Sequence, residues 1–343
     1  MKGVPESFGT LHRMLEMQAY RPAHWRVAAS DINYRRFFDI NGLAGVRVEE
    51  PSVFDATHEL VLRLVREGRL QGLRIDHVDG LADPAGYLER LQGEAGPGFY
   101  ILVEKILEPG EQLRSWPISG TTGYEVLNLI DGVLVRHEAK ERIEGIYRAF
   151  TGQEGRYFDL LRQVKTEILQ SSFASELEVL VSDAKRIADA DRKTRDYTVH
   201  GLRIALSEIV ARFPVYRSYV TDDEPSAEDV RLIEETIVGA RRHSLLPDHS
   251  VHDFIADCML GRIATSGPGR PQPDHVARFR RRFQQLTGPV MAKSLEDTLF
   301  YRYAPLLALN EVGGDPAEFG CTLDHFHAEN AARARDWPNA MIA

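Results

Sequence analysis

Two short apolar stretches, each followed directly by a carboxylate, constrain this sequence more than any other feature. Leu73 and Ile75 alternate with other residues before Asp76, and the apolar run 100–103 precedes Glu104. A continuous apolar run of this length is typical of a strand that is buried on both faces. The pattern therefore predicts two buried strands, each with an acid at its carboxyl end.

The segment between the two stretches predicts a helix. It begins at Asp83-Pro84, with proline in the first turn, and runs to about Leu91. A strand–helix–strand unit indicates a parallel sheet, in which the two acids lie at one edge. Active sites of TIM-type barrels form at this edge, and an adjacent Asp and Glu are the minimum for retaining glycoside chemistry. The alternative interpretation is that the acids cap the following helices or pair with an arginine.

The pattern divides the chain into three parts. Residues 1–138 carry both acids; the first 40 residues are aromatic-rich and predict helix, and Asp55–Glu67 predicts another. Gly120–Tyr124 is a turn signal, expected at the end of a third strand.

Residues 139–282 have apolar residues at helical spacing, which predicts an insertion of several helices. Breaks are expected at 221–229, which is acidic, and at 266–273, which is rich in Pro and Gly. Residues 283–343 predict a return to the barrel pattern from about Gly288, ending at Glu296 and Asp297.

Composition excludes several functions. The 343 residues contain 51 Asp and Glu against 42 Lys and Arg, and the net charge of −9 argues against nucleic-acid and anionic-membrane partners. Cys258 and Cys321 make no metal or disulfide framework. His325 and His327 predict a helix-surface pair rather than a metal site, so no metal is expected. No signal-peptide or membrane-spanning run is present, and we expect a cytoplasmic protein.

The residues around the two acids resemble a known group of enzymes. Residues 72–81, GLRIDHVDGL, resemble the nucleophile segment of the α-amylase superfamily (glycoside hydrolase family 13), and 102–105, LVEK, resemble its acid/base strand. From about Tyr20 to the C-terminus the chain resembles one family, the maltooligosyl trehalose synthases. The further segments that carry this resemblance are INYRRFF (32–38), SGTTGYE (119–125), QLTGPVMAK (285–293), EDT (296–298), FYRY (300–303) and LNEVGG (309–314).

The resemblance implies an α/β fold with large helical content. It would be part of a TIM (β/α)8 barrel, about strands four to seven, that carries an α-helical insertion. Earlier strands and a C-terminal part of the family pattern are not found, and 337–343 reads as the start of a strand. We therefore expect a central fragment, whose missing barrel segments could come from another chain.

The resemblance also implies the site residues. Asp76 would be the nucleophile, with Arg74 keeping it ionised, and Glu104 the general acid and base. The third acid would be Asp297; Glu296 or a residue beyond 343 are the alternatives. Asp79 would bind a sugar hydroxyl or cap a turn. The expected substrate-binding residues are Arg74, His77, Asp79, Tyr124, Lys293 and Arg302.

The activity implied is an intramolecular transglucosylation of maltooligosaccharides. The α-1,4 bond at the reducing end would become an α-1,1 (trehalose) bond by double displacement, with no cofactor. The alternatives are an α-glucan hydrolase or transferase that uses the same acids, and a catalytically silent fragment that needs a partner chain.

Overall fold

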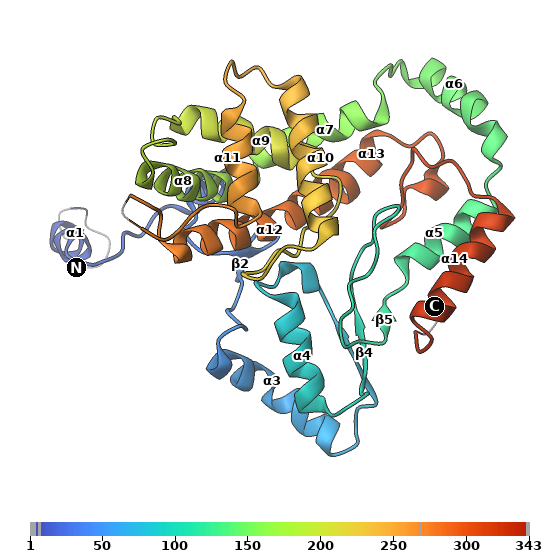
Figure 1. The fold of residues 1–343 in the computed structure, drawn as a ribbon, viewed down its shortest axis with the longest axis horizontal. Coiled ribbons are helices and arrows are strands. Elements are labelled where there is room, and N and C mark those ends of the chain that lie inside the picture. The colour runs from blue at the N-terminus through green and yellow to red at the C-terminus, as the bar shows by residue number, and fades with distance from the viewer. Residues whose placement is uncertain (1–4, 6–7, 268, 341–343) are drawn as a thin grey trace.

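The computed structural model describes residues 5, 8–267 and 269–340, and it has two parts (Figure 1). One part holds a small parallel sheet, flanked by the helices α3 (Pro51–Arg66) and α4 (Pro84–Ala95). The other part is a body of packed helices. The chain is thus a helix-rich α/β protein.

The sheet contains the predicted strand–helix–strand unit. The strands β3 (Gly72–Ile75), β4 (Tyr100–Val103) and β5 (Gly120–Thr121) are parallel and lie in the order β3-β4-β5. Gly72 pairs with Tyr100 and Ile75 with Val103, so β3 and β4 end at the same level. Both predicted strands are confirmed, with an acid directly after each.

The local signals for the helices beside the sheet are confirmed in part. The side chain of Asp83 caps α4, where its carboxylate accepts the backbone N–H of Gly86 at 3.0 Å. Helix α3 begins at Pro51, not at Asp55, because proline suits the first helical position. It ends before Gly68, whose φ of +70° suits glycine.

The expectation of helix throughout residues 1–40 is wrong. Beyond α1 (Phe8–Glu16), the 3₁₀ turn Trp25–Val27 and α2 (Ala28–Asp31), the chain forms an antiparallel hairpin. Its strands are β1 (Arg36–Phe37) and β2 (Ile40–Ala44). Tertiary contacts override the local pattern, since Arg36 is buried and pairs with Glu176 of the helical body at 2.7 Å. Residues 1–4 and 6–7 lie outside the described part.

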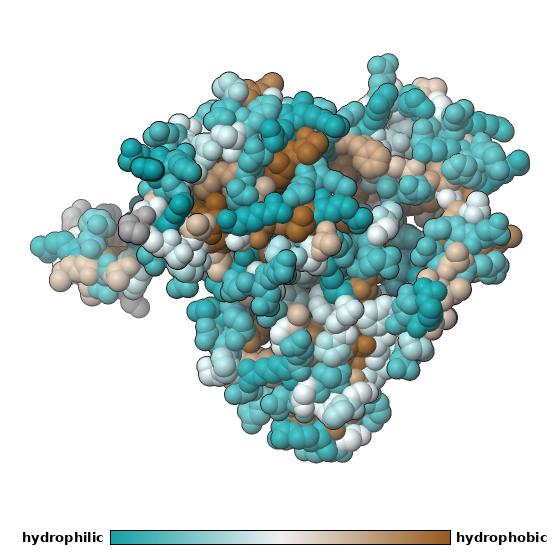
Figure 2. Space-filling view, in the orientation of Figure 1, coloured by the Kyte–Doolittle hydropathy of each residue, from teal (hydrophilic) through white to brown (hydrophobic). Residues whose placement is uncertain are grey.

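The helices predicted within residues 139–282 are formed. The large apolar core of this part is built from residues of helices α7 to α12. Figure 2 shows hydrophobic side chains between these helices, on an otherwise mostly hydrophilic face. The two predicted breaks fall before α10 and before α12, but residues 227–229 already belong to α10 and residue 273 to α12, because Ser226 caps α10 and proline suits the first turn of α12. Residue 268 lies outside the described part. The helices are α6 (Lys140–Thr151), α7 (Tyr157–Gln170), α8 (Ala174–Ala190), α9 (Val199–Arg212), α10 (Ala227–His243), α11 (Ser250–Met259) and α12 (Pro273–Ser294).

The expected strand before Asp297 is wrong. Helix α12 runs past residue 282 to Ser294 and continues as a π-helix, Leu295–Leu299. Pro289 lies inside α12, where an apolar run is buried as helix rather than as strand. The predicted boundary at 282 therefore falls within one continuous helix.

The remaining elements follow either β5 or the π-helix along the chain. They are α5 (Tyr124–Val133), the 3₁₀ turns His137–Ala139 and Leu307–Leu309, α13 (Phe300–Arg302) and α14 (Leu323–Asp336). The predicted strand start at 337–343 is not formed in the described residues 337–340, and 341–343 lie outside them. Among the described residues no helix is long and apolar enough to cross a membrane.

Candidate active site

Asp76 and Glu104 lie at the same edge of the sheet. The hydrogen-bond ladder continues past the strands, because the N–H of Glu104 donates to the carbonyl of Ile75 at 2.7 Å. The N–H of Thr122 likewise donates to the carbonyl of Val103 at 3.0 Å. Three neighbouring strand ends therefore present Asp76, Glu104 and Thr122 side by side.

Asp76 forms an ion pair with Arg74. The guanidinium of Arg74 donates to Oδ1 of Asp76 at 2.7 Å, and both side chains are about half exposed. This hydrogen bond raises the pKa of Arg74. Residues two apart on a strand point to the same face, which explains the contact. The carboxylate is held in place and still accessible.

Glu104 lies in a drier environment. Burial raises the pKa of its carboxyl, and the nearby negative charge of Asp76 raises it further. A hydrogen bond from the backbone N–H of His77 to Oε2 of Glu104, at 3.0 Å, acts in the opposite direction. The two acids therefore differ: Asp76 is paired and exposed, whereas Glu104 is partly buried and has a raised pKa.

His77 forms the turn between the acids. Its backbone is left-handed, with φ +49°, and its ring packs on Phe38 at 4.5 Å and against Phe37 at 5.2 Å between ring centroids. Burial lowers the pKa of the imidazole. The aromatic residues of the hairpin thus pack against the turn that aims its N–H at Glu104.

The carboxylate of Asp79 faces protein groups. Its carboxylate is buried, lies 3.3 Å from the ammonium of Lys105 and accepts the hydroxyl of Tyr219. It forms part of a 3₁₀ turn (Val78–Gly80) rather than capping one. These protein partners favour a structural role for Asp79 over the two roles expected for its side chain.

The two candidates for a third acid lie in different surroundings. Burial raises the pKa of Glu296 to about 7, the hydroxyl of Tyr216 donates to its carboxylate, and the charge of Glu104 contributes to the shift. Asp297 is more than half exposed and pairs with Lys293 at 2.7 Å along the same helix. Glu296 is therefore the acid that lies in the electrostatic surroundings of Glu104.

The expected substrate-binding residues separate into two groups. Burial and then the charge of Glu104 raise the pKa of Tyr124, which places this tyrosine beside the acids. Lys293 lies 5.6 Å from the ring centroid of Phe38 and so borders the same area. Arg302 instead pairs with Glu167 of α7 at 2.7 Å, and its described contacts do not reach the strand ends.

Sequence reasoning missed the buried contacts that Lys105 and Tyr216 make close to the two acids. Lys105 contacts Glu111 at 2.9 Å, and Tyr216 contacts Glu296. Tyr216 and Tyr219 belong to the extended segment 213–221, more than 100 residues after the strands. No local signal indicates contacts over such a separation.

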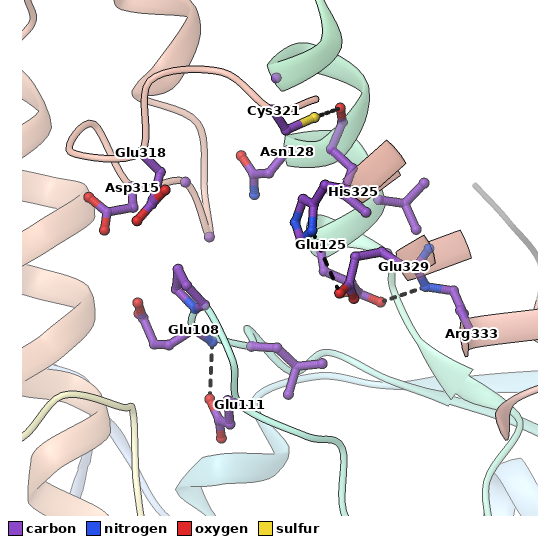
Figure 3. Close-up of a pocket in the computed structure, with 18 of the residues that line it drawn as sticks. Glu108, Glu111, Glu125, Asn128, Asp315, Glu318, Cys321, His325, Glu329 and Arg333 are labelled. Carbon is purple, nitrogen blue, oxygen red and sulfur yellow. Dashed lines mark hydrogen bonds and ion pairs between the residues drawn. The ribbon is translucent and has the colours of Figure 1, made fainter. Parts of the chain in front are cut away.

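The loop after β4 also borders a cavity that neither Asp76 nor Glu104 lines. The cavity has a volume of about 680 Å³ and lies between the loop after β4, helix α5, helix α14 and residues 308–322. Figure 3 shows Glu108, Asp315 and Glu318 on one side of it, with Glu125, His325 and Glu329 on the other. Within the described residues no group of three or more His, Cys, Asp or Glu could hold a metal ion.

Comparison with known proteins agrees with the resemblance that the sequence motifs indicate. No protein-family model matches the chain. A curated Mycobacterium tuberculosis protein, assigned as a maltooligosyl trehalose synthase, is 36% identical over 334 residues, which is 97% of this chain. The chain is homologous to part of the maltooligosyl trehalose synthases. It spans about 40% of the length of this relative.

Solved maltooligosyl trehalose synthases share the fold. The enzyme from Arthrobacter ramosus is 35% identical and superposes with a TM-score of 0.81, over 96% of this chain and 40% of its own. A Sulfolobus tokodaii protein with the same description is 28% identical, with a TM-score of 0.71, over 94% of this chain and 38% of its own. The resemblance inferred from the sequence motifs is confirmed.

Proposed function

We propose that the chain carries the nucleophile and the acid/base of a retaining maltooligosyl trehalose synthase. The observation that carries this proposal is the placement of Asp76 and Glu104 at paired strand ends, one held by Arg74 and the other partly buried. Neighbouring strands lie about 4.8 Å apart. This spacing suits the carboxyl separation of about 5–5.5 Å that retaining chemistry needs.

In the first step Asp76 attacks the anomeric carbon of the glucose unit before the terminal one. Its carboxylate forms the ester bond while the α-1,4 bond breaks. Glu104 gives its proton to the departing oxygen, the 4-hydroxyl of the terminal glucose. The burial that raises the pKa of Glu104 favours the protonated form that this step needs.

In the second step the freed glucose turns within the site. Its anomeric hydroxyl attacks the covalent intermediate, Glu104 takes the proton, and the ester bond to Asp76 breaks. Two inversions leave an α-1,1 bond. Exclusion of water decides between this product and hydrolysis.

The supporting residues follow from their surroundings. We favour Glu296 over Asp297 as the third acid within this chain, because Glu296 is close enough to Glu104 for the charge of Glu104 to raise the pKa of Glu296. Arg74, His77, Tyr124 and Lys293 border the strand ends and would bind substrate, whereas Asp79 and Arg302 have protein partners.

The architecture we propose is a segment of a (β/α)8 barrel of the α-amylase superfamily. The parallel order β3-β4-β5, with α3 and α4 beside it, supports this arrangement. Its domains would be 1–138, the helical insertion from 139, and a final part that begins after α12 rather than at 283.

The test is incubation of the purified chain with maltohexaose, with reducing ends and free glucose followed together. We expect loss of reducing ends without glucose, and loss of this activity in Asp76→Asn and in Glu104→Gln. Asp55→Asn, which removes an exposed partner of Arg90, is the matched control. Glucose release instead would indicate a hydrolase that uses the same acids.

The second candidate is a silent segment that works only with further barrel strands. It is favoured by the sheet, in which β3 and β5 each pair on one side only among the described residues. No change in reducing ends or glucose, with Asp76→Asn behaving like the parent, would support it.

A further inference from the structure

One buried lysine, Lys105, connects the two loops that follow Asp76 and Glu104. The ammonium of Lys105 is 1% exposed, and it lies 3.3 Å from Oδ2 of Asp79 and 2.9 Å from Oε1 of Glu111. It also donates to the carbonyl of Ile106 at 2.8 Å. The side chain of Lys105 is therefore enclosed by protein groups and is not exposed at the strand ends.

The two carboxylates that Lys105 contacts belong to the two acid-bearing loops. Asp79 lies three residues after Asp76, in the loop that also carries the His77 N–H. Glu111 lies in the loop after Glu104, and its Oε2 accepts the N–H of Glu108 at 3.1 Å. One ammonium therefore holds both loops.

The helical body completes this arrangement. Tyr219 donates to the carboxylate of Asp79, and Arg217 donates to the carbonyls of Asp79 and Leu81 at 2.8 and 2.7 Å. The ammonium of Lys105 also lies 5.7 Å from the ring centroid of Tyr216. Tyr216 in turn donates to Glu296, so the buried contacts continue to the candidate third acid.

We infer that Lys105 is a positioning residue, whose buried ammonium ties the loop after Asp76 to the loop after Glu104 and so sets the relative placement of the two acids. A buried ion pair of this kind adds little stability over apolar packing, but truncating one partner leaves an uncompensated charge. Its consequence here is geometric, because the His77 N–H must stay 3.0 Å from Oε2 of Glu104. The catalytic meaning of this inference rests on the proposed function; the contacts do not.

The test follows the His77–Glu104 hydrogen bond rather than turnover. In the ¹⁵N-labelled chain, the amide signal of His77 should titrate with Glu104, as assigned by its loss in Glu104→Gln. Lys105→Met should raise the titration midpoint, because it removes a nearby cation and loosens the N–H bond that favours ionised Glu104. The charged groups facing Glu104 are Asp76, Arg74, Asp79, Glu296 and Tyr124.

A charge-neutral variant separates geometry from charge. Lys105→Met with Glu111→Gln deletes one positive and one negative charge, neither of which is among the charges that face Glu104. The new amide can still accept the N–H of Glu108, which favours folding. The midpoint should still rise, since the loops are no longer tied. A folded double variant with the parent midpoint would overturn the inference.

Lys185→Met is the control for the loss of a lysine charge. The ammonium of Lys185 pairs with Asp189 along α8 at 2.7 Å and donates to the carbonyl of Arg195 at 2.8 Å, and neither contact involves an acid-bearing loop. This variant should leave the His77 titration unchanged, and an equal shift there would also overturn the inference. A shifted midpoint in a chain that does not act on maltohexaose would support the positioning role of Lys105 and would favour the silent segment over a chain that is active alone.

Discussion

Single residues around Glu104 explain how two carboxyl groups can have different roles. Asp76 has a guanidinium partner and solvent, whereas Glu104 has one backbone N–H and a drier surrounding. The same reasoning applies to Glu296, whose burial raises its pKa to about 7. The surroundings of each carboxyl group, rather than its residue type, decide how its pKa shifts.

Glu296 should make stability depend on pH. Its folded pKa of about 7 lies above the unfolded value of 4.5, so the folded chain binds this proton more tightly. The resulting stabilisation is fully present below about pH 4.5 and is lost as the pH rises through 7. Urea unfolding at a series of pH values should show that Glu296→Gln lacks this component; an identical pH dependence in both proteins would contradict it.

Gly80 leaves room for the turn of His77. A Cβ at Gly80 would lie 2.2 Å from Cδ2 of the His77 ring, which Phe37 and Phe38 prevent from moving away. Gly80→Ala should therefore cost about 1–3 kcal/mol, measured by urea unfolding. Gly93→Ala in α4 meets no atom within 4 Å and should gain about 0.5–1 kcal/mol. Equal stabilities of the two variants would show that the ring can adapt.

At the scale of elements, the sequence patterns with local causes were predictable. The unit from β3 to β4 has a capped helix between two apolar strands, and each signal lies within a few residues. The end of α12 was not predictable, because a short buried apolar run does not distinguish helix from strand. The contacts of Asp79 and Lys105 were not predictable either, since their partners in 213–221 lie far along the chain.

The packing of α8 on α12 depends on one buried acid. Asp183 of α8 is 4% exposed, forms an ion pair with Arg278 at 2.9 Å and accepts a hydrogen bond from Arg282, both from α12. Asp183→Asn should lower the free energy of unfolding by about 2–4 kcal/mol, because it removes the charge that both guanidinium groups share.

The control lies on the same helix. Asp189 pairs with Lys185 on the exposed face, and Asp189→Asn should cost less than about 0.5 kcal/mol. Chemical denaturation of both variants gives the comparison, and a cost for Asp183→Asn as small as that of the control would refute the role of this acid in joining α8 to α12.

At the scale of the molecule, two apolar cores of unequal size carry the fold. The larger core lies within the helical body, and a much smaller one lies between the sheet and its helices α3 and α4. A third cluster connects them around Tyr216, Met291 and Leu295. Because stability scales with the apolar area that is buried, the sheet part should be the weaker of the two.

This inequality predicts a split unfolding transition. Trp116 is buried in the sheet core, 5.2 Å from the ring of Tyr219. In a Trp25→Phe, Trp337→Phe background its fluorescence should change at lower urea than far-ultraviolet circular dichroism, which reports mainly on the helices. Coincident transitions would indicate one cooperative unit.

The dependence of the strand-end turns on residues 216–219 also sets an order in time. Helical contacts in the body are short-range and form early, whereas Arg217 reaches the carbonyl of Asp79 across 138 residues of chain. During synthesis the loops after Asp76 and Glu104 leave the ribosome long before the segment that fixes them. The acids can therefore reach their final arrangement only after the helical body has folded. The candidate active site is then the last part of the molecule to form.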